Sequence, residues 1–469
     1  MSDSKARRKL LSQSSFVFAG RIFGAALAFI AQLAIARLWG AQILGEYLLV
    51  IAAVNIIAVV MPLGFETIGT YFAAEYRAKG EGKLLRGFVL RAYGHVALTM
   101  LLLLLGGHQL MSLFGEPGRV VMLYWLPTCI MSFAYALVLV NGALMVGLKR
   151  PYAGYFAEAL ARPMLIIAVV PIAAMAATPE VAFDRLLWMI AAGFVVIAAA
   201  HSAYVIATIR EVPTEVPARA KETRRWWRFA LPWVVISLAT DFFFDLDLLL
   251  LSGLMERHEL AIFGVCTRIF GIIAFGVTAV YAVNLPDMFE SEALKDRKGF
   301  HRKVGDANLV ASILAIVLFG GVAIGAPIAL TLFGPEFAAG ALPLTILSVA
   351  MLMRALLGPT ALVLSIHDRP YSTLPAIALG MATLVAANLL MVPPLGLMGA
   401  ALAALLAQTV WSAALWYTAL RTAEIDVSIM PRLREMLKGQ PEEATDKPVP
   451  HAPPEAVLQK AQDEFMPKP

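Results

Sequence analysis

The chain has 469 residues, of which 60% are hydrophobic and only 15% are charged. Its mean hydropathy of +0.75 excludes an ordinary soluble globular domain of this length. Apolar runs of about twenty residues recur from end to end, which indicates a polytopic helical membrane protein. The net charge of +5 does not indicate a nucleic-acid partner, because the basic residues cluster beside the apolar runs. Cys129 and Cys266 both lie inside such runs, so no disulfide is predicted.

The apolar runs predict an all-α polytopic membrane protein with about 12 transmembrane helices. The expected spans are 14–36, 44–64, 88–106, 119–147, 158–177, 185–208, 229–253, 261–284, 306–330, 340–366, 373–392 and 398–420.

The distribution of Lys and Arg predicts the orientation of these spans. With the N-terminus inside, the inner segments hold 30 of the 38 basic residues and the outer segments hold four. Because basic residues are retained on the cytoplasmic side, both termini are predicted to be cytoplasmic.

Two short motifs occur twice in the chain. Leu113-Phe-Gly-Glu-Pro is matched by Leu332-Phe-Gly-Pro-Glu, and Arg150-Pro-Tyr is matched by Arg369-Pro-Tyr, both at an offset of 219 residues. Chance recurrence of turn motifs is the poorer explanation, because both pairs fall at equivalent places between spans. Six spans repeated as six give two parallel lobes around a central cavity, which is the natural place for a site.

The repeat sets the expected domains. Residues 1–208 form an N-terminal six-helix lobe, 209–228 a cytoplasmic linker and 229–420 a C-terminal six-helix lobe. Residues 421–469 form a cytoplasmic tail that is rich in Pro, Glu and Lys, and we expect it to be largely disordered after about residue 438.

Span seven carries three carboxylates, Asp241, Asp245 and Asp247, and span eight carries Arg268. Each charge near the centre of a spanning helix costs roughly 2.5–3.5 kcal/mol, so such residues normally face a partner or a wet cavity. Asp247 and Arg268 have similar predicted depths. Three readings stay open: a charge pair lining a cavity, a carboxylate that couples transport to H⁺ or Na⁺, and a structural pair that neutralises Arg268.

The three aspartates cannot share one role. Asp241 and Asp245 are four residues apart on one helical face, whereas Asp247 projects from nearly the opposite side. At least one of them is therefore expected to be structural.

Further arginines lie inside spans. Arg21 shares a small, polar face of span one with Gly24 and Gln32, which is typical of a cavity-lining helix. The alternative is that Gly20 to Gly24 form a small-residue packing motif and Arg21 reaches the inner surface. Arg354 lies in the middle of span ten. Residues near the inner ends of spans are interpreted as interfacial: Arg91, His95, Glu158 and Arg162.

The sequence lacks the signatures of common enzymes. It has no Gly-x-x-x-x-Gly-Lys-Ser/Thr phosphate loop, no Cys/His cluster with metal-ligand spacing and no nucleophile–base arrangement. We therefore predict no catalytic, cofactor-binding or metal-binding residues, and a transporter rather than an enzyme.

Several degenerate motifs, in this order and spacing, resemble one transporter family. They are Ile35-Ala-Arg-Leu-Trp-Gly-Ala-Gln-Ile-Leu-Gly-Glu-Tyr, Ala74-Glu-Tyr-Arg-Ala-Lys, Phe229-Ala-Leu-Pro, Leu332-Phe-Gly-Pro-Glu-Phe and Pro394-Leu-Gly-Leu-Met-Gly-Ala-Ala. In these motifs the chain is similar to one branch of the multidrug/oligosaccharidyl-lipid/polysaccharide (MOP) exporter superfamily. This is the polysaccharide-transport branch, which contains the O-antigen and exopolysaccharide flippases.

The resemblance implies a bacterial inner-membrane flippase that works by alternating access in surface polysaccharide biosynthesis. Its substrate would be an undecaprenyl-pyrophosphate-linked oligosaccharide, and its other partners would be membrane lipids and polysaccharide polymerase or assembly proteins. Arg21 and Arg268 match places where relatives carry cavity cations, and with Arg354 they are the predicted substrate-binding residues. The density of Asp in span seven departs from a uniformly cationic cavity.

Three other functions stay open. An ion-coupled exporter of small molecules with the same fold is favoured by the aspartates of span seven. A membrane polymerase or acyltransferase is disfavoured by short outer loops, and an assembly partner in an envelope complex is suggested only by the tail.

Overall fold

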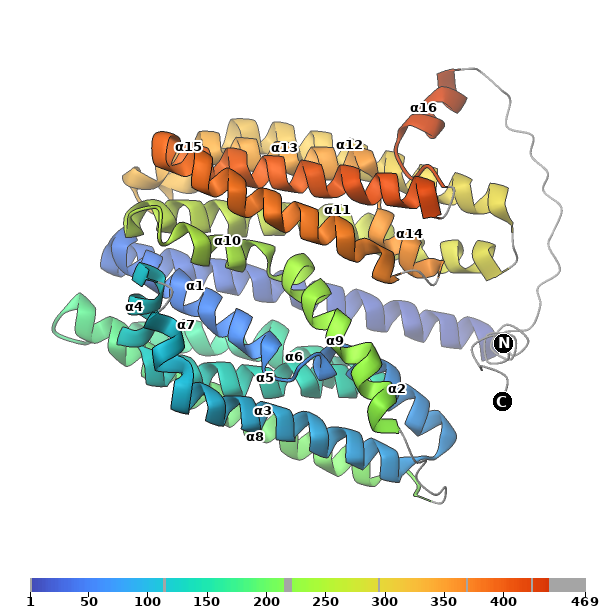
Figure 1. Ribbon diagram of the computed structural model, residues 1–469, viewed down its shortest axis with the longest axis horizontal. Coiled ribbons are helices and arrows are strands. Elements are labelled where there is room, and N and C mark those ends of the chain that lie inside the picture. The colour runs from blue at the N-terminus through green and yellow to red at the C-terminus, as the bar shows by residue number, and fades with distance from the viewer. Residues whose placement is uncertain are drawn as a thin grey trace. The chain divides into compact units, whose positions relative to one another are not determined.

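The computed structural model describes residues 2–112, 115–214, 222–293, 296–367, 370–422 and 425–437 (Figure 1). Throughout these ranges the regular elements are helices and no strand occurs. The all-α prediction is therefore confirmed. The tail was expected to be disordered after about residue 438, and those residues lie outside the described ranges. The described part of the tail ends at Leu437.

The first half contains α1 (Ser2–Val60), α2 (Phe65–Lys79), α3 (Gly82–Ser112), α4 (Gly115–Leu123), α5 (Trp125–Gly147), α6 (Pro151–Phe156), a π-helix η1 (Ala157–Ala161), α7 (Arg162–Ala173) and α8 (Pro179–Arg210). The second half contains α9 (Glu222–Asp241), α10 (Phe243–Leu251), α11 (Arg257–Ala293), α12 (Arg297–Thr331), η2 (Pro335–Gly340), α13 (Ala341–Leu357), α14 (Thr360–Ile366), η3 (Pro370–Thr373), α15 (Leu374–Thr422) and α16 (Met430–Leu437).

Each predicted span has a helical counterpart. In the described ranges, nine helical stretches are long and apolar enough to cross a membrane. Two of these stretches hold two spans each, joined at Gly40 (φ 83°) in α1 and at Gly396 (φ 53°) in α15. Glycine takes these left-handed backbone angles without a steric penalty. Span seven is divided between α9 and α10, which accounts for the remaining expected span.

Span seven is broken in the middle of its aspartates. Phe242 leaves the helical region (φ −119°, ψ 21°) between the end of α9 at Asp241 and the start of α10 at Phe243. Asp241 and Asp245 therefore belong to different helices. The expectation that they share one helical face was wrong, because the four-residue spacing has that meaning only in an unbroken helix.

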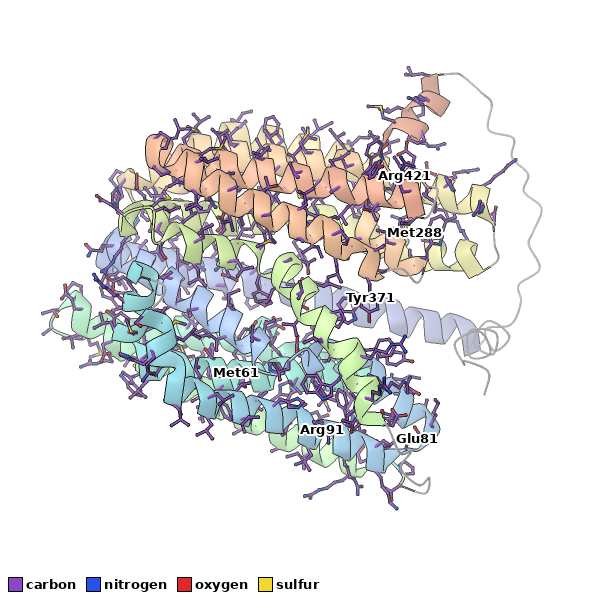
Figure 2. All side chains as sticks on the ribbon, viewed as in Figure 1. Met61, Glu81, Arg91, Met288, Tyr371 and Arg421 are labelled. Carbon is purple, nitrogen blue, oxygen red and sulfur yellow. The ribbon has the colours of Figure 1, made fainter. Side chains whose placement is uncertain are left out.

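The chain forms two compact units. One consists of residues 1–274, 318–351 and 374–411, and the other of residues 275–317, 352–373 and 412–469. In the first unit, α1 packs against α5, α7 and α10, and α2 packs against α5 and α9. The second unit has its own apolar core, which includes Met288 (labelled in Figure 2), Phe300 and Ala419. The division into two six-helix lobes stays a prediction.

The start of α9 is held on α2 by a set of polar contacts that we call the inner cluster: Glu75, Tyr76, Glu222, Arg225 and Trp226. The Trp226 indole donates to the Tyr76 hydroxyl (2.7 Å), which donates to Glu222 (2.8 Å). The Arg225 guanidinium donates to both oxygens of Glu75 (2.8 and 3.1 Å). Charge-assisted bidentate pairs of this kind are stronger and more directional than neutral hydrogen bonds.

Two further contacts fix α9 in the same place. Gly64, at the start of α2, has a left-handed backbone (φ 84°), and an added Cβ would lie 2.2 Å from the carbonyl oxygen of Ala230 in α9. Arg91 of α3, labelled in Figure 2, donates to Thr223 (2.6 Å) and lies 5.5 Å from the ring of Trp226. The first half of span seven is therefore closely packed on α2 and α3.

The Glu75–Arg225 pair makes stability depend on pH. Burial raises the pKa of the Glu75 carboxyl, but the hydrogen bonds and charges of Arg225 and Lys79 outweigh this and hold its pKa below the usual range. A carboxyl with a lowered pKa adds stability above its unfolded pKa, and the stability is lost as pH falls through the folded pKa. We expect Glu75→Gln to cost about 1–3 kcal/mol at pH 7.

This cost should shrink as pH falls from about 4 through the lowered folded pKa, since the carboxyl of the unfolded chain is protonated first and that of the folded protein only at lower pH. Chemical unfolding of the detergent-solubilised protein across this pH range measures it. The matched control is Glu211→Gln, which removes an ion pair to Arg150 (2.6 Å) whose carboxylate is 63% exposed, and should cost less than about 1 kcal/mol. Equal costs for the two variants at pH 7 would contradict the prediction.

Candidate functional site

A buried carboxylate, Asp245 of α10, lies at the centre of the candidate site. Arg268 of α11 donates to its Oδ1 (3.0 Å), and the Asn55 amide of α1 donates to its Oδ2 (3.1 Å). Asp245 is only 4% exposed, whereas the Arg268 side chain is 30% exposed. Both oxygens of the carboxylate are thus satisfied, and three helices are connected through one charge.

A second arginine extends this network. Arg162 of α7 donates to the Asn55 Oδ1 (2.9 Å), so the amide links it to Asp245. The guanidinium lies 4.2 Å from the ring centroid of Tyr135, whose hydroxyl donates to Glu158 (3.1 Å). Glu158 and Arg162 were interpreted as interfacial residues, but the structure places Arg162 in the same network as Arg268.

The backbone around Arg162 has an unusual local structure. Residues Ala157–Ala161 form a single π-helical turn directly before Arg162, and such turns are frequent at functional sites. Gly24 of α1 approaches this turn so closely that an added Cβ would lie 1.7 Å from the Ala159 carbonyl oxygen. The packing interpretation of Gly24 is therefore supported, and the close approach positions α1 against the turn that presents Arg162.

Asp247 has a different environment from Asp245. It is fully buried, and its Oδ1 accepts a hydrogen bond from the Asn388 amide of α15 (2.7 Å). Among the described residues, Asp247 Oδ2 and Asn388 Oδ1 have no hydrogen-bond partner. The candidate pair of Asp247 with Arg268 was wrong, since Arg268 contacts Asp245 instead, and the separate roles expected for these two aspartates are matched by separate partners.

The structure does not gather the other predicted site residues around Asp245. Asp241 ends α9 and is exposed. Arg21 is exposed and lies 5.4 Å from the ring of Tyr155. Arg354 is exposed near the end of α13 and belongs to the second compact unit. A joint role of Arg21, Arg268 and Arg354 in substrate binding therefore stays a prediction.

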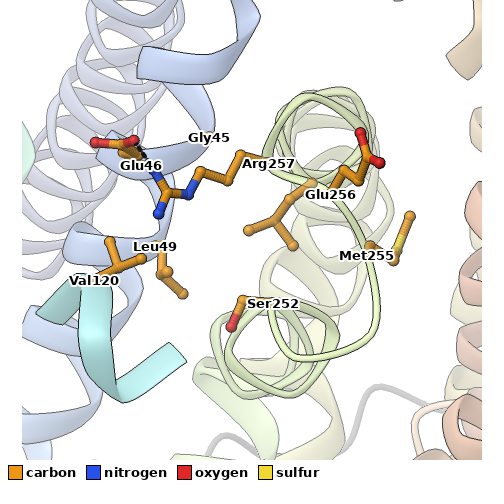
Figure 3. A pocket seen from close by; sticks show the side chains of 9 residues that line it. Gly45, Glu46, Leu49, Val120, Ser252, Met255, Glu256 and Arg257 are labelled. Carbon is orange, nitrogen blue, oxygen red and sulfur yellow. Dashed lines mark hydrogen bonds and ion pairs between the residues drawn. The ribbon is translucent and has the colours of Figure 1, made fainter. Parts of the chain in front are cut away.

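A cavity of about 240 Å³ lies near the predicted outer ends of spans two and eight (Figure 3). An ion pair between Arg257 of α11 and Glu46 of α1 borders it, and Glu46 also accepts a hydrogen bond from Tyr124 (3.2 Å). Beside the pair, an added Cβ on Gly45 would lie 2.2 Å from the Arg257 carbonyl oxygen. This contact was not predicted from the sequence, although Arg257 is one of only four basic residues in the predicted outer segments.

A double-mutant cycle tests which aspartate pairs with Arg268. Because Asp245→Ala and Arg268→Ala each leave a partner unsatisfied, the double variant should lose less stability than the two single losses combined, by about 0.5–3 kcal/mol. Denaturant titration of the purified protein in detergent measures the three losses. The matched cycle with Asp247→Ala and Arg268→Ala should be additive within about 0.5 kcal/mol. Coupling in the second cycle but not in the first would refute the observed pairing.

We compared the chain with known protein families, curated sequences and solved structures. No protein-family model and no curated protein sequence matches the chain. Solved structures do match. An inward-facing multidrug resistance MATE family transporter of the MOP superfamily is 12% identical, with a TM-score of 0.69 over 86% of this chain and 95% of the other.

Two further solved structures give the same result. The lipid II flippase MurJ in an inward closed conformation is 12% identical, with a TM-score of 0.64 over 91% of this chain and 94% of the other. An outward-facing MATE family transporter is 14% identical, with a TM-score of 0.61 over 87% and 94%. The chain thus has the all-helical, multi-pass fold that these MOP-superfamily transporters share.

Proposed function

We propose that the chain is a flippase that moves an undecaprenyl-pyrophosphate-linked oligosaccharide across the bacterial inner membrane, with both termini in the cytoplasm. The observation that carries this proposal is the state of Arg268. Its guanidinium donates to Asp245 (3.0 Å), its Nε has no hydrogen-bond acceptor among the described residues, and 30% of the side chain is accessible. An arginine that is partly satisfied and partly accessible within a spanning helix is suited to bind an anionic group.

The fold supports the same proposal. One structural neighbour is a lipid II flippase and others are multidrug resistance transporters, so proteins of both kinds have this fold. The sequence motifs favour the polysaccharide-transport branch, whose cargo carries a pyrophosphate. The cationic groups around Asn55 and Asp245 offer that pyrophosphate charge-assisted hydrogen bonds, which are shorter and stronger than neutral ones.

Two contacts between distant parts of the chain would act as the alternating closures. The inner cluster holds α9 on α2, and the Glu46–Arg257 pair holds the start of α11 on α1. Alternating access requires that only one of these closures opens at a time. When the outer pair opens, water can solvate the Arg257 side chain, which is 39% exposed, whereas Glu46 is 7% exposed and keeps the hydrogen bond from Tyr124.

Transport by the reconstituted protein tests this function. Proteoliposomes carry a fluorescent lipid-linked oligosaccharide, and the fraction that becomes accessible to an external quencher is followed with time. We expect Arg268→Ala to reduce the rate at least about tenfold, as loss of a charge-assisted hydrogen bond of about 1.5–3 kcal/mol implies. The rate of Arg268→Lys should fall between those of the wild type and Arg268→Ala, because lysine keeps the charge but lacks the planar guanidinium with its paired donors.

The control variant is Arg421→Ala (labelled in Figure 2), which removes an exposed arginine stacked 5.3 Å from the Tyr417 ring and should leave the rate unchanged. Melting temperatures of all variants separate lost transport from lost folding. A wild-type protein that moves no lipid-linked oligosaccharide under any ion gradient would refute the proposed cargo.

A second candidate function is favoured by Asp247. Among the described residues, Asp247 Oδ2 and Asn388 Oδ1 have no hydrogen-bond partner, so this hydrogen-bonded pair offers two unused acceptors to a bound cation. Carboxylate and amide oxygens suit hard cations, and a carboxylate also binds H⁺. An ion-coupled exporter of small molecules, or a flippase driven by the same ion, would use this pair as its coupling site.

Thermal stability in the presence of the ion tests the coupling site. A cation that binds only the folded protein stabilises it by about 2.7 kcal/mol at a hundred times its Kd. We expect added Na⁺, or lowered pH if the ion is H⁺, to raise the melting temperature of the wild type but not of Asp247→Asn. The matched control is Asp306→Asn, which alters a 43%-exposed carboxylate and should keep the response. Identical responses in wild type and Asp247→Asn would remove Asp247 from coupling.

A further inference from the structure

Of the two arginines in the candidate site, Arg162 has a weaker hydrogen-bond acceptor than Arg268. Arg268 shares the charge of Asp245, but the acceptor of Arg162 is the neutral amide oxygen of Asn55 (2.9 Å). Within the described part of the chain, no carboxylate lies within ion-pair distance of Arg162. Its guanidinium instead stacks on Tyr135 (4.2 Å) and lies 5.5 Å from the Phe194 ring.

This arrangement presents a guanidinium without neutralising it. Aromatic faces stabilise a cation while leaving its charge intact, and a stacked arginine keeps its in-plane N–H donors available. A fully charged side chain in an apolar helical layer is costly unless it serves a partner. The nearby Glu158 lies beyond ion-pair distance of Arg162, and one of its oxygens accepts a hydrogen bond from Tyr135 (3.1 Å).

The backbone positions Arg162 specifically. The π-helical turn Ala157–Ala161 inserts one extra residue per turn directly before Arg162, which rotates the following side chains relative to a regular α-helix. Gly24 lets α1 contact the carbonyl oxygen of Ala159 in this turn. Arg162 and Arg268 come from α7 and α11, which belong to different predicted lobes, and they meet through Asn55 and Asp245.

We propose that Arg162 is a second anion-binding residue, and that Arg162 and Arg268 together bind the two phosphoryl groups of a diphosphate, one guanidinium to each. The inference rests on the proposed function and deepens it. A phosphoryl oxygen is a stronger acceptor than the amide of Asn55, so Arg162 changes partner at a small cost. Arg268 keeps its bond to Asp245 and offers the second phosphoryl group its remaining N–H donors, including Nε, which has no acceptor among the described residues; Asn55 keeps its hydrogen bond to Asp245.

The proposal predicts preference for diphosphate over a single phosphate. The Asn55 amide and the Asp245 carboxylate lie between the two guanidinium groups, so two linked phosphoryl groups reach both more readily than the single phosphoryl group of orthophosphate. Removal of either arginine should therefore weaken diphosphate binding strongly and orthophosphate binding less. A merely structural role of Arg162 would lower stability without changing this ratio.

Binding to the purified full-length protein in detergent tests it, with inorganic pyrophosphate, inorganic orthophosphate and a short-chain polyprenyl diphosphate as probes. We expect Arg162→Gln, which keeps a donor for Asn55, to weaken binding of both diphosphates at least about tenfold, as the loss of one charge-assisted hydrogen bond implies. The ratio of orthophosphate to pyrophosphate Kd should fall toward one. Arg162→Lys should recover part of the affinity, because it keeps the charge.

Arg150→Gln is the matched control, since it removes another arginine of the first half that is bonded to Tyr204 (2.9 Å) and Glu211 (2.6 Å). It should leave all three Kd values unchanged. If Arg162→Gln folds and keeps the wild-type ratio while Arg268→Gln loses it, the inference fails and the proposed function stands. If the wild type binds pyrophosphate and the polyprenyl diphosphate no better than orthophosphate, the inference and the diphosphate cargo both fail.

Discussion

The interaction on which the candidate site depends is the neutralisation of Asp245 within a layer of apolar helices. An isolated carboxylate there would be strongly destabilising, and removal of one partner from a buried ion pair typically costs about 3–5 kcal/mol. Asp245 avoids this cost because Arg268 and Asn55 satisfy its two oxygens. Any rearrangement that separates α1, α10 and α11 must therefore provide a new acceptor for Arg268 and a new donor for Asp245. An anionic ligand supplies the acceptor, which links ligand binding to helix rearrangement through one set of bonds.

Asp245 and Asp247 show how two neighbouring carboxylates acquire different chemistry. Residues two apart on a helix project from nearly opposite faces, so Asp245 meets α1 and α11 while Asp247 meets α15. Asp245 has a positive partner and no unused oxygen. Asp247 has a neutral partner and one unused oxygen. In the first arrangement Arg268 keeps Nε without an acceptor among the described residues, which suits binding of a further anion, and the second arrangement suits binding of a cation.

The sequence predicted those parts of the fold that depend on local properties. The spans follow from hydropathy alone, because about twenty apolar residues are needed to cross the bilayer in any fold. The opposite directions of Asp245 and Asp247 follow from helical periodicity. The partner of Arg268 could not be derived in this way. Similar depth favoured Asp247, but the choice depends on how α10 is rotated relative to α11, which is a property of packing between helices.

Two further features were not predicted from the sequence, because they too depend on packing between helices. The break at Phe242 has no sequence signal of its own, since Pro232 lies ten residues earlier in α9. Arg162 was assigned to the interface from its distance to the end of a span. The π-turn before it and the close approach of Gly24 become visible only when two helices are placed together.

Span two contacts parts of the second half at three levels. At its predicted outer end, Gly45 lies against the backbone of Arg257, and at its predicted inner end Gly64 lies against the backbone of Ala230. Between them, Asn55 bonds to Asp245. The end contacts need glycine because a Cβ would collide with a carbonyl oxygen. Beside the outer contact, the Glu46–Arg257 ion pair must also break when the two parts separate. The central contact is different, because a hydrogen bond to a buried carboxylate is expensive to break without a replacement. Under the alternating access proposed above, the two ends would open in turn, while Asn55 and Asp245 would stay joined as the pivot between them.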